Sequence, residues 1–94
     1  MSKLFHVELV AVEAKVWSGE AEAVFARTTE GELGVLAGHA PLFGQLAAPG
    51  QVRIKVGNGE ELRYDVDGGF LSVTDHGVTV LAETAVPATA AAAH

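Results

Sequence analysis

The chain has 94 residues, of which 49% are hydrophobic, and its 12 acidic and 6 basic side chains give a formal net charge of −6. This length predicts one domain with a modest core, and the hydrophobic content argues against disorder. Because no run of Lys and Arg occurs, we expect neither a nucleic-acid partner nor docking on an anionic membrane surface. Cysteine is absent, which excludes disulfides, and no stretch approaches the ~18 apolar residues of a membrane span, so we expect no direct membrane insertion.

Alternation of apolar and polar residues with a period of two predicts β structure along most of the chain. In residues 5–11 the odd positions are apolar, as expected for a strand with one buried face. A second strand is predicted over residues 21–29. There, Val24 and Phe25 are adjacent apolar residues, so both faces of this strand are expected to be partly covered.

Residues 51–56 and 61–66 predict a β-hairpin. Each segment alternates, and Gly57-Asn58-Gly59 between them tolerates positive φ. The apolar rows, which we expect to be core, are Val52, Ile54 and Val56 on one strand and Leu62, Tyr64 and Val66 on the other. The polar rows carry opposite charges that favour antiparallel pairing, Arg53 and Lys55 against Glu61 and Asp65.

A second hairpin is predicted from residues 70–74 and 78–82, joined by three residues, Asp75-His76-Gly77, with the glycine placed for a bulge. Short strands at this spacing are typical of an all-β sandwich or barrel. The Ala-rich residues 86–94 are too few for an isolated helix, so we expect a frayed tail or the stub of a longer element.

Residues 30–42 form the most distinctive segment, with three glycines and Pro41 close together. One interpretation is a tight turn between strands. The other is a shaped edge that presents Glu30, Glu32 and His39 to a partner. Spacing alone leaves both open.

This segment resembles the signature of the epsilon subunit of bacterial F-type ATP synthases. Residues 66–73 and 78–85 match the same family, as does an opening strand followed by Val16-Trp17-Ser18-Gly19, so the similarity runs from about Leu4 to Ala85. The resemblance implies an all-β fold, a ten-stranded β-sandwich or flattened barrel. The sequence stops where the family's C-terminal helical hairpin would begin, so we expect that hairpin to be missing. We therefore expect a sandwich domain over residues 1–85 and, over residues 86–94, an Ala-rich tail or the stub of that hairpin, in either an engineered domain or a naturally shortened subunit.

The resemblance also implies a function. The family's sandwich is a non-catalytic part of the rotor stalk of the proton-translocating synthase, where it links the gamma subunit to the c-subunit ring and couples proton flow to ATP synthesis. The expected location is peripheral, on the cytoplasmic side of the bacterial cell membrane. The inhibitory and ATP-binding functions of the hairpin are not carried over to this chain.

Two groups of residues are the expected interfaces. The resemblance places Gly38, His39, Ala40, Pro41 and Leu42 toward the gamma subunit. It places Glu30 and Glu32 toward the polar loops of the c ring, where acidic side chains would fix the docking register if those loops are basic.

No catalytic residue, cofactor or metal ligand is expected. His6, His39 and His76 are isolated and lack metal-ligand spacing. The alternative function is a free-standing protein- or carbohydrate-binding module, with Trp17 and Tyr64 as the aromatic platform for a sugar.

Overall fold

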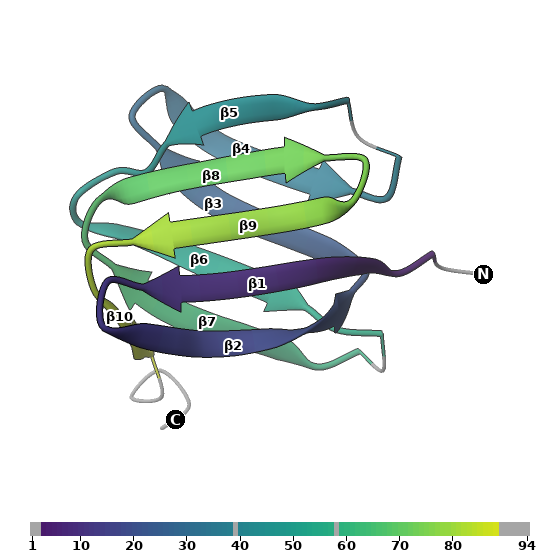
Figure 1. Ribbon diagram of the computed structural model, residues 1–94, viewed down its shortest axis with the longest axis horizontal. Coiled ribbons are helices and arrows are strands. Elements are labelled where there is room, and N and C mark those ends of the chain that lie inside the picture. Colours follow the sequence, from purple (N-terminus) through teal and green to yellow (C-terminus); the bar gives the residue numbers. More distant parts are fainter. Residues whose placement is uncertain (1–2, 39, 58, 89–94) are drawn as a thin grey trace.

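The computed structural model describes residues 3–38, 40–57 and 59–88, which form two packed β-sheets with no helix among them (Figure 1). The ten strands are β1 (Phe5–Ala11), β2 (Ala14–Ala21), β3 (Ala23–Thr28), β4 (Gly31–Leu36), β5 (Leu42–Gln45), β6 (Gly50–Lys55), β7 (Glu61–Val66), β8 (Gly69–Thr74), β9 (Gly77–Ala82) and β10 (Ala85–Pro87). The predicted ten-stranded β-sandwich is confirmed.

The strand order places β4 and β5, which follow one another in the chain, at edges of different sheets. Sheet 1 has the order β2-β1-β9-β8-β5, and sheet 2 has the order β10-β7-β6-β3-β4. All neighbours pair antiparallel except β1 and β9, which are parallel. Because β4 and β5 are both edge strands, the chain passes from one sheet to the other within the distinctive segment 30–42.

The inner faces of the two sheets form one apolar core, and no polar or charged residue is buried in the described part of the chain. Side chains without solvent exposure come from both sheets and include Val7, Leu9, Val24, Val52, Ile54, Leu71 and Val80. The predicted core rows at Val52 and Ile54 are therefore confirmed. Phe25 is half-buried on the outer side of β3, as expected for a strand covered on both faces.

Four strands were not predicted individually from the sequence, and all four are edge strands: β2, β4, β5 and β10. The tight-turn interpretation of residues 31–36 is wrong, because these residues pair along the whole length of β3. Glycine has a low strand propensity, so Gly31 and Gly34 favour a turn in the sequence. In the structure, pairing with β3 holds them in a strand.

The β6–β7 hairpin is confirmed, but its charge pairing differs from the prediction. Lys55 lies opposite Glu61 as expected. Arg53, however, lies opposite Arg63 and not opposite an acidic residue. An acidic partner for Arg53 must therefore come from outside this hairpin.

The β8–β9 hairpin has a two-residue turn rather than the three-residue connection expected. Gly77 pairs with Thr74, and only Asp75 and His76 lie between the strands. Gly77 has φ +138°, and a Cβ atom at this position would collide with the backbone oxygen of His6. Glycine is thus needed where the turn passes close to β1.

The sandwich extends beyond the expected boundary at Ala85. Val86 and Pro87 continue β10, which pairs with β7, and the backbone N–H of Ala88 donates to the carbonyl of Arg63 at 2.9 Å. Residues 89–94, the rest of the expected tail, lie outside the described residues.

Candidate functional site

The two expected interfaces begin at opposite ends of strand β4. Glu30 lies in the turn before the strand, and Gly38 lies just after its end. Six residues of extended chain between them span about 20 Å, at ~3.3 Å per residue. Glu30 and Gly38 therefore lie far apart, at opposite ends of β4.

Hydrogen bonds order the turn that carries Glu30. The hydroxyl of Thr28 donates to the carbonyl of Gly31 at 2.7 Å, and the backbone N–H of Glu30 donates to the same hydroxyl oxygen at 3.2 Å. The N–H of Thr29 donates to the carbonyl of Gln45 at 3.0 Å, which ties this turn to the end of β5. Glu30 is exposed, and its backbone position is fixed.

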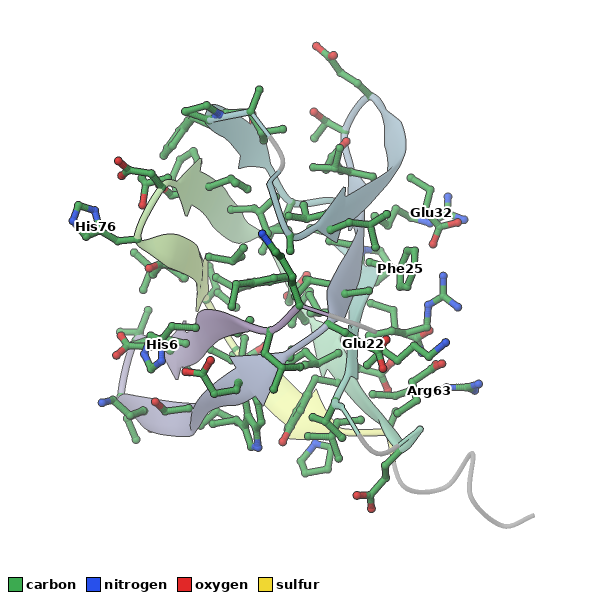
Figure 2. The ribbon with its side chains drawn as sticks, turned by 90° about the vertical axis from the view of Figure 1, so that its right-hand side faces the viewer. His6, Glu22, Phe25, Glu32, Arg63 and His76 are labelled. Carbon is green, nitrogen blue, oxygen red and sulfur yellow. The ribbon has the colours of Figure 1, made fainter. Side chains whose placement is uncertain are left out.

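Glu32 projects from the outer face of sheet 2, where it meets Arg53. An Nη atom of Arg53 donates to a carboxylate oxygen of Glu32 at 3.1 Å. The guanidinium carbon of Arg53 also lies 5.0 Å from the centre of the Phe25 ring. Figure 2 shows Phe25, Glu32 and Arg63 on the same outer side of the sandwich, away from His6 and His76. Arg53 and Phe25 were not predicted as site residues.

A hollow of about 400 Å³ lies between edge strands β4 and β5. Its lining includes Glu30 and Glu32 on one side and Leu42 and Phe43 on the other. The structure therefore brings Leu42, expected at the gamma interface, next to the two acids expected at the c ring. Gly38 does not line this hollow.

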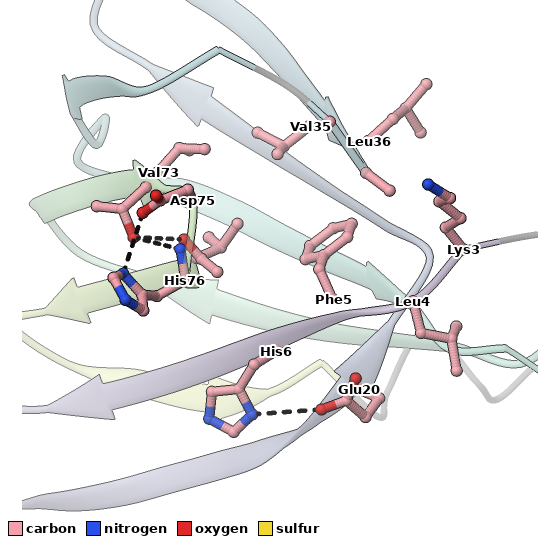
Figure 3. A pocket seen from close by; sticks show the side chains of 15 residues that line it. Lys3, Leu4, Phe5, His6, Glu20, Val35, Leu36, Val73, Asp75 and His76 are labelled. Atoms are coloured by element: carbon pink, nitrogen blue, oxygen red, sulfur yellow. Dashed lines mark hydrogen bonds and ion pairs between the residues drawn. The ribbon is translucent and has the colours of Figure 1, made fainter.

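Gly38 instead borders a larger pocket, of about 560 Å³, at the end of the sandwich where β1 begins (Figure 3). Its apolar lining includes Phe5, Val35 and Val73, with Leu36 near the rim, and the close-up shows these side chains drawn around one opening. Leu36 is 60% exposed. Charged and polar residues such as Lys3, Glu20 and Asp75 also line it, so this end of the sandwich offers a pocket of mixed chemistry beside Gly38.

The other residues expected at the gamma interface differ in their exposure. Ala40 and Pro41 are exposed, and His39 lies outside the described residues. Leu42 is half-buried and packs against the core, so its side chain faces inward. The next residue, Phe43, is 69% exposed.

The outer face of sheet 1 carries an apolar patch that was not predicted from the sequence. The rings of Phe43 and Phe70 stack with their centroids 5.1 Å apart. Leu81, which pairs with Phe70, is also exposed, and Val10 pairs with Leu81 on the next strand. We call Phe43, Phe70, Leu81 and Val10 the sheet 1 patch. The available signal was the alternation in β8, which puts Phe70 in the outward row with Ser72 rather than with the core.

The two residues expected to bind a sugar do not form a shared platform. Trp17 is half-buried on β2 and packs against the core, while Gly19 leaves room for its ring. Tyr64 lies in the core on sheet 2, and its burial raises the pKa of the phenol above the ordinary value of 10.0. The aromatic faces are not presented together to solvent.

Among the described residues, no group of three or more His, Cys, Asp and Glu side chains is placed to hold a metal ion. The same part of the chain contains no helix long and apolar enough to cross a membrane.

Comparison with known proteins identifies the family. The family model for the β-sandwich domain of the ATP synthase delta/epsilon chain matches residues 4–88. The chain belongs to this family. Two similar relatives, each called ATP synthase epsilon chain, are 60% identical over 79 residues, or 84% of this chain, and come from Frankia casuarinae and Corynebacterium urealyticum.

These relatives differ in how much of their own length is matched. The aligned region covers 92% of the Frankia protein and 64% of the Corynebacterium protein. A cryo-EM structure of the Euglena gracilis mitochondrial ATP synthase, with its F1 part and c ring, contains a similar chain with a TM-score of 0.83 and 32% identity. That similarity covers 89% of this chain and 53% of the other. The delta/epsilon chain is a subunit of the ATP synthase complex, and this chain has its sandwich domain.

Proposed function

We propose that this chain is a non-catalytic subunit of the rotor of a proton-translocating F-type ATP synthase, where it links the gamma subunit to the c ring. The observation that carries the proposal is the family match over residues 4–88, together with 60% identity to two bacterial epsilon chains. On this proposal the protein turns as part of the rotor and transmits torque without chemistry of its own.

The proposed gamma-binding surface combines the segment after β4 with the sheet 1 patch. Gly38, His39, Ala40, Pro41 and Leu42 were expected there from the resemblance. The exposed Phe43, directly after them, extends that surface onto the outer face of sheet 1. Stable protein interfaces have an apolar centre with enriched aromatic residues, and the stacked pair of Phe43 and Phe70 has that character. We infer that Leu42 acts mainly by supporting Phe43 from the core side.

The proposed c-ring surface is the acidic end of β4. Glu30 and Glu32 are both exposed, and they lie on either side of Gly31, at the start of the strand. Carboxylates at this edge would orient the chain on basic loops of a c ring and steer the docking encounter. The sandwich would then bridge two partners with different chemistry, an apolar one and a basic one.

This role implies a location. A protein that binds the c ring through loops is a peripheral membrane component, and in a bacterium the F1 side of the synthase faces the cytoplasm. We therefore propose that the chain resides on the cytoplasmic side of the bacterial cell membrane and is held there by its partners.

Binding to the gamma subunit tests the proposal. The purified chain should retain gamma from the same organism in a pull-down, and it should give no signal on a glycan array. Retention of gamma without glycan binding is the expected result. Glycan binding in the absence of gamma retention would favour a free-standing carbohydrate-binding module instead.

A further inference from the structure

We propose that Arg53 is a positioning residue that holds the Glu32 carboxylate in place for its contact with the c ring. The inference rests on the proposed function, and it adds to the expected interface a residue that no sequence motif indicated. Arg53 lies on β6 and Glu32 on β4, two strands that are separated in sheet 2 by β3.

Arg53 reaches across the intervening strand. Its side chain passes over Phe25 of β3, with the guanidinium carbon 5.0 Å from the ring centre, and its Nη atom donates to Glu32 at 3.1 Å. The guanidinium is thus held from below by an aromatic face and from one side by a carboxylate. A stacked guanidinium is more restricted than one in free solvent, so it offers its hydrogen bond from a fixed place.

The neighbouring strand makes room for this arrangement. Gly34 pairs with Phe25, and a Cβ atom at Gly34 would lie 3.1 Å from the phenyl ring. A side chain there would push the ring, and with it the stacked guanidinium, away from Glu32. Gly34, which made β4 hard to predict from the sequence, therefore leaves the space that the Phe25 ring needs.

Two other arginines lie near the pair. Arg63 lies directly opposite Arg53 and repels it, while Arg63 has its own carboxylate partner in Glu61, with Nε 2.9 Å from the oxygen. On the other side, Arg27 pairs in register with Glu32 along β3 and β4. Glu32 is therefore flanked by two cationic residues, and the structure pairs it with Arg53.

Stability alone does not account for this arrangement. The side chain of Glu32 is 54% exposed and that of Arg53 is 32% exposed, and ion pairs in such positions add little to folding. Holding Glu32 in one orientation before docking would, however, reduce the ordering needed when a partner binds. The exposed part of the carboxylate remains accessible to a basic loop.

The test compares Glu32→Gln, Arg53→Gln and the double variant, with Arg63→Gln as the matched control. Arg63 has an equivalent pair with Glu61 on the same outer face, but it does not contact Glu32.

Each variant is assembled with the gamma subunit, and its affinity for the purified c ring is measured. We expect Glu32→Gln and Arg53→Gln each to weaken binding by about two- to fivefold, within the range of one exposed charged contact. The double variant should be no weaker than either single one, and Arg63→Gln should bind like wild type.

A spectroscopic measurement separates positioning from a general charge effect. The side-chain ¹⁵N signals of Arg53 should be shifted from those of free arginine in the wild type and should move toward them in Glu32→Gln. Wild-type binding by Arg53→Gln, with Glu32→Gln weakened, would overturn the inference and leave the proposed function standing. Equal losses in Arg53→Gln and Arg63→Gln would also overturn it. If both Glu32→Gln and Arg53→Gln bind the c ring like wild type, Glu32 does not contact the ring and the inference fails together with that assignment. If the wild-type chain does not bind the gamma subunit at all, the proposed function itself is overturned.

Discussion

Phe43 of β5 and Phe70 of β8 stack on the outer face of sheet 1, with ring planes inclined by 25° and centroids 5.1 Å apart. The two side chains are 69% and 44% exposed. Large aromatic residues that stack in solvent form an apolar surface on which a partner would exclude water. We propose this pair as part of the gamma-binding surface.

Replacing Phe43 by Ser should weaken gamma binding by roughly 30-fold, which corresponds to about 2 kcal/mol for a buried aromatic contact. Isothermal titration with purified gamma measures this change. Val12→Ser is the control, because Val12 is 67% exposed in the β1–β2 turn and lies outside the patch. Equal affinities for wild type and Phe43→Ser would place the gamma interface on another face.

Ile54 tests the assignment of the core. Its side chain has no solvent exposure on the inner face of β6, so Ile54→Ala should lower the free energy of unfolding by about 2–5 kcal/mol. Val86→Ala should change it by less than ~0.5 kcal/mol, because Val86 is 56% exposed on the edge strand β10. Urea denaturation followed by tryptophan fluorescence gives both values. A small loss for Ile54→Ala would mean that the inner and outer faces of β6 are exchanged.

Gly77 should be more sensitive to substitution than another glycine with positive φ. Gly77→Ala adds both backbone strain and a collision with the carbonyl of His6, whereas Gly59→Ala adds strain alone, since nothing lies within 4 Å of a Cβ atom there. We expect a loss of about 1–3 kcal/mol for Gly59→Ala and a larger loss for Gly77→Ala. Thermal unfolding of the two variants compares them directly, and equal losses would argue against the close approach of the β8–β9 turn to β1.

Tyr64 should make stability fall at high pH. Its burial raises the pKa of the phenol above 10.0 in the folded state, so between the unfolded and folded pKa values the folded chain keeps a proton that the unfolded chain releases. The contribution is fully present below pH ~10 and is lost as pH rises through the folded pKa. Unfolding free energies of wild type and Tyr64→Phe, measured from pH 8 to pH 12, should diverge in this range. Parallel curves would show that the phenol is not desolvated in the fold.

The sequence was most informative where strands are neighbours along the chain. The β6–β7 hairpin could be predicted because its residues alternate and the connection is rich in glycine. Strand β2 could not, since an edge strand with both sides partly exposed has no clear apolar row. Strand β4 carries Gly31 and Gly34, which favour a turn until the pairing with β3 is known.

The candidate site could be predicted only in part, for a related reason. Glu30 and Glu32 were found through the motif that contains them. The contact between Glu32 and Arg53 joins residues 21 positions apart and depends on the order of three strands, which local patterns do not reveal. The stack of Phe43 on Phe70 likewise depends on the pairing of β5 with β8.

Reconstitution of the synthase tests the central claim most directly. An F-type ATP synthase depleted of its epsilon subunit is supplied with this chain, and proton-driven ATP synthesis is measured at increasing concentrations of the chain. If the sandwich links gamma to the c ring, synthesis should rise to saturation with the wild type and should rise less, at the same concentration, with Phe43→Ser. Synthesis that stays at the level of the depleted enzyme, although the chain is folded and present in excess, would contradict the account.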